Sequence, residues 1–357
     1  MPSVAQAGPV IPRLSRTLNR WLSLWLTFCL CRADAAPVRI IFDTDMHTDC
    51  DDAGALAVLH ALADRGEAEI VACMVSTLDP WAAPTVDAIN TYYDRPDVPI
   101  GGVKGAGVLR KSPYTKAVAT TFPHDVEPSG SIPDAVQLYR QLLEKEADAG
   151  VMIVTVGYLT NIQRLLSLPA AEGRLSGGEL ARRKVKQWVC MGGNFIGNPP
   201  RDDLRLGNVN FTYDKQAALD AIRGWPGTLV FAGREVCSVP SGLQLGASLA
   251  RTPRENPVRA AYEAYFGGVA KDRHVADLVT VLYAVRGLRD YWDLEERGVM
   301  RLREDVTFEW DYGQESEQAF LRKKLRDGKP NDRYIEQVLD ELLVQPPRSP
   351  PAAKPRD

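Results

Sequence analysis

Short apolar runs alternate along the chain with longer segments in which apolar residues recur at helical spacing. The runs at residues 38–42, 69–76, 151–156, 185–190 and 228–232 are rich in β-branched or other apolar residues. Runs of this length, bounded by turn residues, are typical of buried parallel strands. Helical spacing follows from residue 52, over 132–147 and 255–266, and from residue 277. This alternation predicts an open α/β fold with a mostly parallel sheet flanked by helices.

The most unusual stretch is the first of these strands and the helix after it, residues 38–59, VRIIFDTDMHTDCDDAGALAVL. The turn between the two elements holds five aspartates within ten residues, with no Lys or Arg among them: Asp43, Asp45, Asp49, Asp51 and Asp52. Repulsion between like charges opposes packing these groups together unless a cation is present. A hard divalent metal ion is the simplest explanation.

Three other interpretations of the acidic stretch compete with a metal site. A solvated turn with an aspartate at a helix N-terminus explains one acid better than five. An EF-hand loop requires Gly and Glu where this chain has Thr48 and Gly54. A haloacid-dehalogenase-type phosphatase would use Asp43 as nucleophile and Asp45 as acid, but it would leave the acidic pair before the helix without a task. That phosphatase remains an alternative.

The stretch resembles the signature of the inosine-uridine-preferring nucleoside hydrolase family, in the branch with the longer spacing, DTDMHTDCDDAGAL. The resemblance implies a Rossmann-like fold and a Ca²⁺ cofactor. It implies that Asp45 and Asp52 are calcium ligands, that Asp45 is the base that takes a proton from water, and that Asp51 contacts a ribose hydroxyl. Asp43, on the same strand face as Asp45, is expected to support the site from behind.

Later segments match the same family in chain order. GYLTNI, which begins at residue 157, is similar to the family's TGPLTNI, so the carbonyl of Val156 is the expected backbone calcium ligand. MGG at 191–193 is a second landmark. Asn210 matches an asparagine that holds the ribose, and Asp277 resembles the family's late calcium-binding aspartate. The alternative for Asn208 and Asn210 is a structural role as capping or turn residues before the next helix.

Three positions that touch sugar or base depart from the family. Asp79 stands where an Asn contacts the ribose, and Asn208 stands where the family has Glu. Ala276 stands where well-studied members have a His that protonates the leaving base, or where the longer-spaced branch has Trp. Alanine can neither donate a proton nor stack on a purine. His274 is the candidate replacement acid, and His47 is a candidate contact to the substrate.

The resemblance implies calcium-dependent hydrolysis of the N-glycosidic bond of a ribonucleoside or a related N-riboside. Because the departures affect sugar and base positions but spare the metal set, a catalytically altered or inactive member that binds metal and sugar is the competing hypothesis. The sequence determines neither the base nor the sugar.

Composition excludes several other partners. The formal net charge of the 357 residues is −3 and there is no basic stripe, so nucleic-acid binding has no electrostatic support. The expected partner is therefore a small-molecule nucleoside or N-riboside. Cysteines outside the N-terminal segment lack zinc-like spacing, and no disulfide can be assigned: Cys50, Cys73, Cys190 and Cys237. Family members are commonly dimers or tetramers, which allows a homo-oligomer.

The N-terminal segment predicts export. Basic residues precede an apolar run at 21–31, and Ala-Asp-Ala at 33–35 has the form of a signal-peptidase site. The run is short for a membrane span, so an uncleaved anchor is the secondary alternative. We expect an export signal at 1–35 and a periplasmic or secreted protein without stable membrane association after cleavage.

The remaining chain is expected to form a nucleoside hydrolase-like domain at 36–346, followed by a disordered, Pro-rich tail at 347–357. Within the domain, the polar segment 105–131 predicts a surface loop or, alternatively, a segment that covers the substrate.

Overall fold

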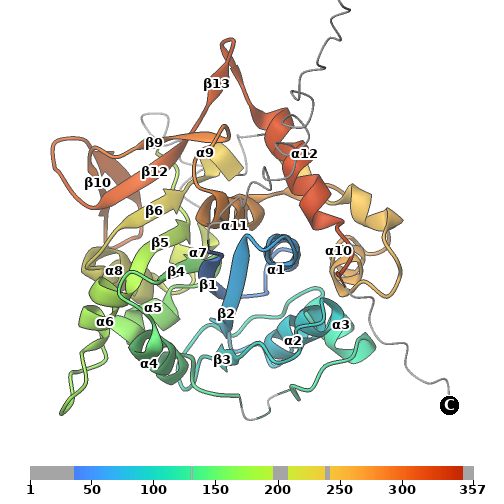
Figure 1. The fold of residues 1–357 in the computed structure, drawn as a ribbon, viewed down its shortest axis with the longest axis horizontal. Helices are drawn as coiled ribbons and strands as arrows, with labels where there is room; N and C mark the ends of the chain where they lie inside the picture. Colours follow the sequence, from blue (N-terminus) through green and yellow to red (C-terminus); the bar gives the residue numbers. More distant parts are fainter. Residues whose placement is uncertain (1–35, 129, 131, 196–207, 238–241, 349–357) are drawn as a thin grey trace, which may run out of the picture. The chain divides into compact units, whose positions relative to one another are not determined.

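A central sheet of eight strands, in the order β3-β2-β1-β4-β5-β6-β12-β9, organises the described chain (Figure 1). The computed structural model describes residues 36–128, 130, 132–195, 208–237 and 242–348. The expected export signal at 1–35 and residues 349–357 of the expected tail lie outside this part. Within it, no helix has the length and apolar character needed to cross a membrane.

The prediction of a mostly parallel sheet is confirmed. All neighbouring strands from β3 to β12 pair in parallel, and only the edge strand β9 is antiparallel to its neighbour. The strands of this sheet are β1 (Val38–Thr44), β2 (Ala68–Val75), β3 (Ile100–Gly102), β4 (Val151–Thr155), β5 (Val185–Met191), β6 (Leu229–Ala232), β9 (Trp292–Glu295) and β12 (Gln318–Lys323).

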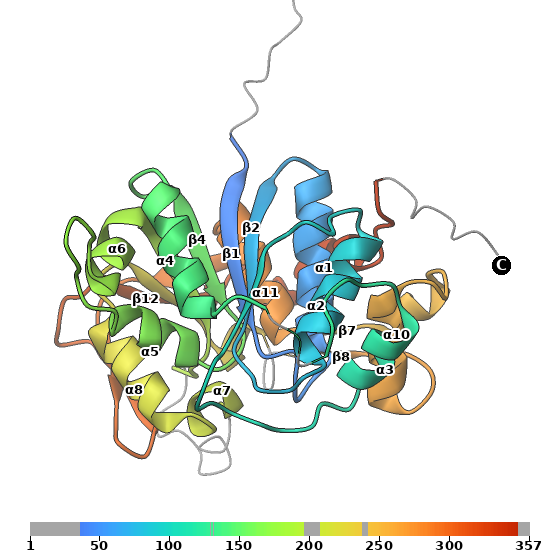
Figure 2. The same cartoon turned by 90° about the horizontal axis from the view of Figure 1, so that it is seen from below.

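Helices cover both faces of the sheet (Figures 1 and 2). One face carries α1 (Asp51–Asp64), α2 (Ala82–Tyr92), α3 (Thr115–Thr121), α10 (Pro257–Phe266), α11 (Ala276–Arg286) and α12 (Asp332–Leu343). The other carries α4 (Ala135–Lys145), α5 (Thr160–Leu166), α6 (Gly177–Lys184) and α8 (Lys215–Gly224). An apolar core lies on each face of the sheet, so the strands are buried on both sides. Neighbouring β1 residues belong to different cores: Phe42 packs on the face that carries α1, and Ile41 packs on the face that carries α4.

Short elements complete the described part. The helices α7 (Val209–Thr212) and α9 (Arg234–Cys237) follow β5 and β6 in the chain. Three two-stranded antiparallel ladders pair β7 (Gln244–Leu245) with β8 (Arg273–His274), β10 (Val299–Leu302) with β11 (Phe308–Asp311), and β13 (Leu325–Arg326) with β14 (Lys329–Pro330).

The segment 105–131 differs from the predicted loop because it contains α3. The first turn of α3 is buried at Thr115, and Val118 and Ala119 are buried further along. Thr85 on α2 donates its hydroxyl hydrogen to the carbonyl of Thr115 at 2.9 Å, which holds the two helices together. Within α3 only Val118 and Ala119 are buried apolar residues, which are too few to give a helical pattern that stands out in the sequence.

One glycine allows β1 and β4 to end side by side. A Cβ on Gly157, just past β4, would lie 2.3 Å from the backbone nitrogen of Asp45, just past β1. Any side chain at this position would therefore push the two strand ends apart. The carboxyl ends of parallel strands are where open α/β sheets bind ligands.

Candidate active site

The turn after β1 is shaped by hydrogen bonds that converge on one carboxylate. Asp52 Oδ1 accepts from the hydroxyl of Thr44 and, at 3.2 Å, from the backbone N–H of Met46. Met46 adopts a φ of 45°, in the left-handed region that is uncommon for a residue other than glycine. The bonds to Asp52 hold this strained turn in place, so the local sequence fixes the start of α1 and its acids.

Three carboxylates from two distant segments meet at the end of the sheet. Asp51 and Asp52 begin α1, and Asp277 lies in the first turn of α11. One oxygen from each lies within 4.8 Å of the other two, and all three residues are at most 4% exposed. The backbone N–H of Asp277 donates to Asp51 at 3.4 Å. Burial, and then repulsion among the acids, raises the pKa of each of these carboxyls above its ordinary value.

These carboxylates face a cavity of about 220 Å³. It is lined by Asp45, Thr48, Asp49, Asp51, Asp52, Val156, Met191, Asn208, Val209, Asn210, Arg234, Arg273, His274, Ala276 and Asp277. The structure therefore brings eight sequence-predicted site residues around one space: Asp45, Asp51, Asp52, Val156, Asn208, Asn210, His274 and Asp277.

The donor set fits a hard divalent cation. Buried, mutually repelling carboxylates are stabilised by a positive charge, and oxygen ligands suit calcium. The sequence placed Asp45, Asp52 and Asp277 in the metal set, whereas the closest three-carboxylate group here contains Asp51 in place of Asp45. Asp45 lines the same cavity, and its charge contributes to raising the pKa of Asp52. The Val156 carbonyl also lines the cavity and accepts from the Asn210 amide at 2.9 Å.

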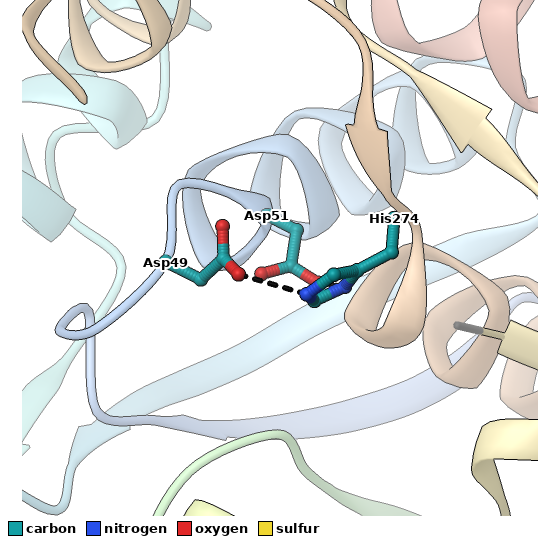
Figure 3. A group of neighbouring side chains, drawn as sticks. All are labelled: Asp49, Asp51 and His274. Carbon is teal, nitrogen blue, oxygen red and sulfur yellow. Dashed lines mark ion pairs between the residues drawn. The ribbon is translucent and has the colours of Figure 1, made fainter. Parts of the chain in front are cut away.

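A second charged group surrounds the imidazole of His274 (Figure 3). His274 Nε2 lies 2.9 Å from Asp49, and Nδ1 lies 3.4 Å from Asp51. Arg273 Nε lies 2.8 Å from both oxygens of Asp49. Burial lowers the pKa of His274, but the charge of Asp51 and the bonds to both carboxylates overcome that effect and raise it to about 9. The imidazole is therefore protonated at neutral pH.

The contacts with Arg273 and His274 explain the presence of Asp49, a residue to which the sequence assigned no role. Against the effect of burial, the imidazole of His274 and then the guanidinium of Arg273 lower the pKa of Asp49 to about 2. Asp49, Asp51 and His274 also lie close enough together to hold a metal ion. Because Arg273 already neutralises Asp49, a cation is better placed among Asp51, Asp52 and Asp277.

Two asparagines form another wall of the cavity. Asn208 precedes α7, and neither polar atom of its side chain has a hydrogen-bond partner in the described chain. Asn208 occupies the N-cap position of α7 but makes no capping bond with its side chain, whereas Asp214 caps α8 by accepting from the N–H of Ala217. The glycine of the MGG motif, Gly192, packs against Asn208 and Phe211, where a Cβ would lie 2.9 and 2.4 Å from their side chains. The absence of a side chain at Gly192 therefore leaves room for α7 and not for a ligand.

Two predicted substrate contacts lie outside this cavity. Asp79 accepts from the hydroxyl of Thr115 at 2.7 Å and from the N–H of Trp81 at 3.2 Å, and it lines a separate cavity of about 150 Å³. His47 lines a neighbouring space with Thr48, a residue common to both cavities. Asp79 is therefore held in the packing between α2 and α3.

Asp43 is buried behind the cavity, as the prediction of a supporting role requires. Its carboxyl accepts from the hydroxyl of Tyr139 at 2.9 Å and from the amide of Asn161 at 3.2 Å. Burial raises its pKa to about 8 despite these bonds. A neutral, enclosed carboxyl is poorly suited to act as a nucleophile, which argues against the phosphatase hypothesis.

Sequence reasoning missed several residues of the cavity wall. Arg273 precedes His274 directly, and this basic residue beside a candidate acid was the available signal. Arg234 at the start of α9 carried no motif. Tyr158, outside the cavity wall, lies within the GYLTNI motif, and its hydroxyl is 3.2 Å from His47 Nδ1. Each of these residues reaches the site through contacts between segments distant in the chain.

The raised pKa values of the site carboxyls predict two pH trends: one for the Tm of the metal-free protein and an opposite one for the increase in Tm caused by calcium. Because folding raises the carboxyl pKa values, with that of Asp45 raised to about 7, their stabilising contribution is complete below about pH 4 and is lost as the pH rises through the folded values. We expect the Tm of the metal-free protein to fall between pH 5 and 8, and the increase in Tm caused by calcium to grow over the same range.

Thermal unfolding in EGTA and in excess Ca²⁺ measures both trends. Asp277→Asn is the matched variant, since it removes one charge and keeps the shape of the side chain; it should weaken both the pH trend and the calcium effect. A calcium-induced increase in Tm of the same size at every pH would contradict the expectation.

The fold and the cavity define an open α/β protein with a carboxylate-rich site at the carboxyl ends of its parallel strands. The family model for inosine-uridine preferring nucleoside hydrolase matches residues 40–341. The chain belongs to this family, which confirms the resemblance found in the sequence, and the family consists of hydrolases that act on N-glycosyl bonds. No curated protein sequence matches the chain.

Solved structures share the fold at low sequence identity. A plant nucleoside hydrolase is 19% identical with a TM-score of 0.60, and the match covers 87% of this chain and 100% of that one. A purine-preferring ribonucleoside hydrolase from Gardnerella vaginalis is 15% identical with a TM-score of 0.60, covering 85% and 98%. A type III effector protein complexed with adenosine diphosphate ribose is 15% identical with a TM-score of 0.55, covering 86% and 92%.

Proposed function

We propose that this protein is a calcium-dependent hydrolase that cleaves the N-glycosidic bond of a ribonucleoside or a related N-riboside. The observation that carries the proposal is the meeting of Asp51, Asp52 and Asp277, all buried, in one cavity beside Asp45. Family membership supplies the reaction class. The cavity offers oxygen ligands for a metal ion, a carboxylate that can act as base and an imidazole that can act as acid, which are the groups this reaction needs.

Calcium would be held by Asp45, Asp52 and Asp277, with the carbonyl of Val156 and with Asp51 beside them. The ion would supply positive charge that makes nearby water more acidic and holds sugar hydroxyls. Asp45 takes the proton from the attacking water. Without a metal ion, burial raises the pKa of Asp45 to about 7. A calcium ion at this carboxylate would lower that pKa and keep Asp45 ionised, which is the form that accepts a proton.

Asp51 and Asn210 orient the ribose in this proposal. Asn210 is held by its bond to the Val156 carbonyl, so its remaining amide atoms have a fixed direction. The transition state carries positive charge on the sugar ring, and the surrounding carboxylates stabilise it. Asn208, neutral where the family has Glu, reduces this negative field.

His274 donates the proton to the leaving base. Asp49 holds Nε2 at 2.9 Å, whereas Nδ1 has only the longer, 3.4 Å contact with Asp51 and is the nitrogen that would turn to a leaving base. Ala276 lines the same cavity, so the imidazole enters from a position two residues earlier than in well-studied members.

Release of free base from purine and pyrimidine ribosides, with and without calcium, tests the proposal. Turnover that depends on calcium supports it. The competing function, a metal- and sugar-binding protein without turnover, is favoured by the neutral side chains of Asn208 and Ala276. No turnover on any riboside, together with a retained calcium-induced rise in Tm, would establish that alternative.

We also propose, from the N-terminal sequence pattern, that the protein is exported to the periplasm or secreted. Fractionation of cells that express the full chain, with N-terminal sequencing of the exported form, tests the expected cleavage after residue 35.

A further inference from the structure

A second, more open cavity of about 500 Å³ adjoins the candidate active site. Six residues line it: His47, Thr48, Leu109, Arg110, Lys111 and Pro113. Thr48 also lines the carboxylate-rich cavity, so the two spaces lie on either side of this residue. The proposed function uses none of the basic residues of this second cavity.

The charge of the second cavity is opposite to that of the first. Arg110 and Lys111 contribute two cations, and in the described part of the chain neither makes an ion pair with a carboxylate. Unpaired cations beside a strongly acidic site attract an anion and shield it from the nearby aspartates.

Arg110 is held in position by an aromatic contact. Its guanidinium lies 4.2 Å from the centre of the Tyr213 ring, and Tyr213 packs edge-to-face against Tyr158 at 6.0 Å between ring centres. A cation over an aromatic face loses little of its capacity to bind an anion at its edge, since the guanidinium donors lie in its plane. The contact with Tyr213 thus fixes the direction in which the Arg110 side chain enters the second cavity.

The loop that carries these cations is fastened at its base. Leu78 N–H donates to the carbonyl of Val108 at 2.8 Å, and Arg164 donates to the carbonyl of Lys104 at 2.6 Å. The second cavity is therefore bounded by a segment tied both to the end of β2 and to α5.

His47 supplies an oriented polar group. It is 2% exposed and lines the second cavity, and Nε2 has no hydrogen-bond partner among the described residues. Its Nδ1 lies 3.2 Å from the Tyr158 oxygen. When that hydroxyl donates to Nδ1, Nε2 carries the hydrogen and can donate to an anionic oxygen. The carbonyls of Arg110 and Lys111 lie near the ring but do not meet hydrogen-bond geometry with Nε2.

We propose that this second cavity binds an anionic group of the substrate, so that the preferred substrate is an N-riboside bearing a phosphate or a carboxylate. This inference rests on the proposed function. Two cations and the buried imidazole of His47, whose Nε2 donates when the Tyr158 hydroxyl donates to Nδ1, form the kind of recognition site that suits either group. Neutral Asn208, in place of an acid, is consistent with an anionic substrate in the adjoining cavity.

Two substrate pairs distinguish the sources of the anion. A nucleoside 5′-monophosphate is compared with its nucleoside, and nicotinate riboside is compared with nicotinamide riboside. In at least one pair, we expect kcat/KM for the member that carries the phosphate or carboxylate to exceed that for the member without it by about 10-fold or more, since charge-assisted hydrogen bonds contribute about 1.5–3 kcal/mol each. The pair that shows the preference identifies the group. Equal values within both pairs would overturn the proposal.

For the pair that shows the preference, kcat/KM of the member with the phosphate or carboxylate is divided by kcat/KM of the member without it. The Arg110→Ala, Lys111→Ala double variant should lower this ratio by about 10-fold or more. Lys104→Ala is the matched control, because it removes an exposed cation from the same loop without touching this cavity, and it should keep the ratio. An unchanged ratio in the double variant would contradict the proposal. If no riboside is hydrolysed, the proposed function fails; calorimetric Kd values for the same pairs and variants then decide the binding inference alone.

Discussion

Asp45→Asn is expected to lower kcat for riboside hydrolysis by about 10²–10⁴-fold, the range typical of a lost general base. Asn keeps the shape of the side chain and an oxygen that can accept from the backbone N–H of His47, a bond of 3.1 Å in the native protein. It removes the negative charge and the capacity to take a proton from water. Initial rates at saturating calcium and substrate give the effect on kcat directly.

Asp43→Asn is the matched control for this prediction. The residue is two positions earlier, outside the cavity, and its pKa of about 8 makes the native carboxyl mostly neutral at pH 7, so the substitution removes little charge. We expect riboside hydrolysis to persist and the free energy of unfolding to fall by about 1–3 kcal/mol as hydrogen bonds rearrange. Equal losses of activity in both variants would contradict the assignment of the base. Phosphatase activity abolished by Asp43→Asn would revive the haloacid-dehalogenase-type alternative.

The parts of the fold that the sequence predicted are those in which one local pattern decides the structure. The buried parallel strands appear as continuous apolar runs because both of their faces are covered, so β1, β2, β4, β5 and β6 were predicted within a few residues of their observed bounds. The short antiparallel ladders were less visible, since two- to four-residue strands give no periodicity.

The residues of the candidate site fall into the same two groups: those that a local motif reveals and those that depend on contacts between distant segments. Residues that follow a strand or open a helix, such as Asp45, Asp52 and Asp277, come from local motifs and line one cavity, while their roles stay predictions. Asp49 could not be assigned because its partner Arg273 lies 224 positions away in the chain. Asp79 follows a strand at the correct edge of the sheet, but the packing of α2 against α3, which no local pattern reveals, places it outside this cavity.

His274→Gln is expected to have an effect that depends on the leaving group. For a nucleoside whose base must be protonated to leave, kcat should fall by about 10²–10⁴-fold. For 4-nitrophenyl riboside, whose leaving group is stable as an anion, the fall should be no more than a few fold. Parallel kcat measurements on the two substrates separate a proton donor from a residue that only shapes the cavity, because loss of shape would reduce both rates alike.

The pH profile gives an independent measure of the same group. Without calcium, Asp51 and Asp49 raise the pKa of His274 to about 9 against the effect of burial. Asp49 stays beside the imidazole when calcium is bound, so the acid form persists at neutral pH and is lost on the alkaline side. The kcat for the nucleoside should fall on this alkaline side, and His274→Gln should abolish that fall. Asp49→Asn removes a carboxylate 2.9 Å from the imidazole and should move the fall to lower pH while leaving hydrolysis of 4-nitrophenyl riboside nearly unchanged. An alkaline limb that does not move in Asp49→Asn would contradict the assignment of His274, because the acidic pair around the imidazole is what keeps it protonated.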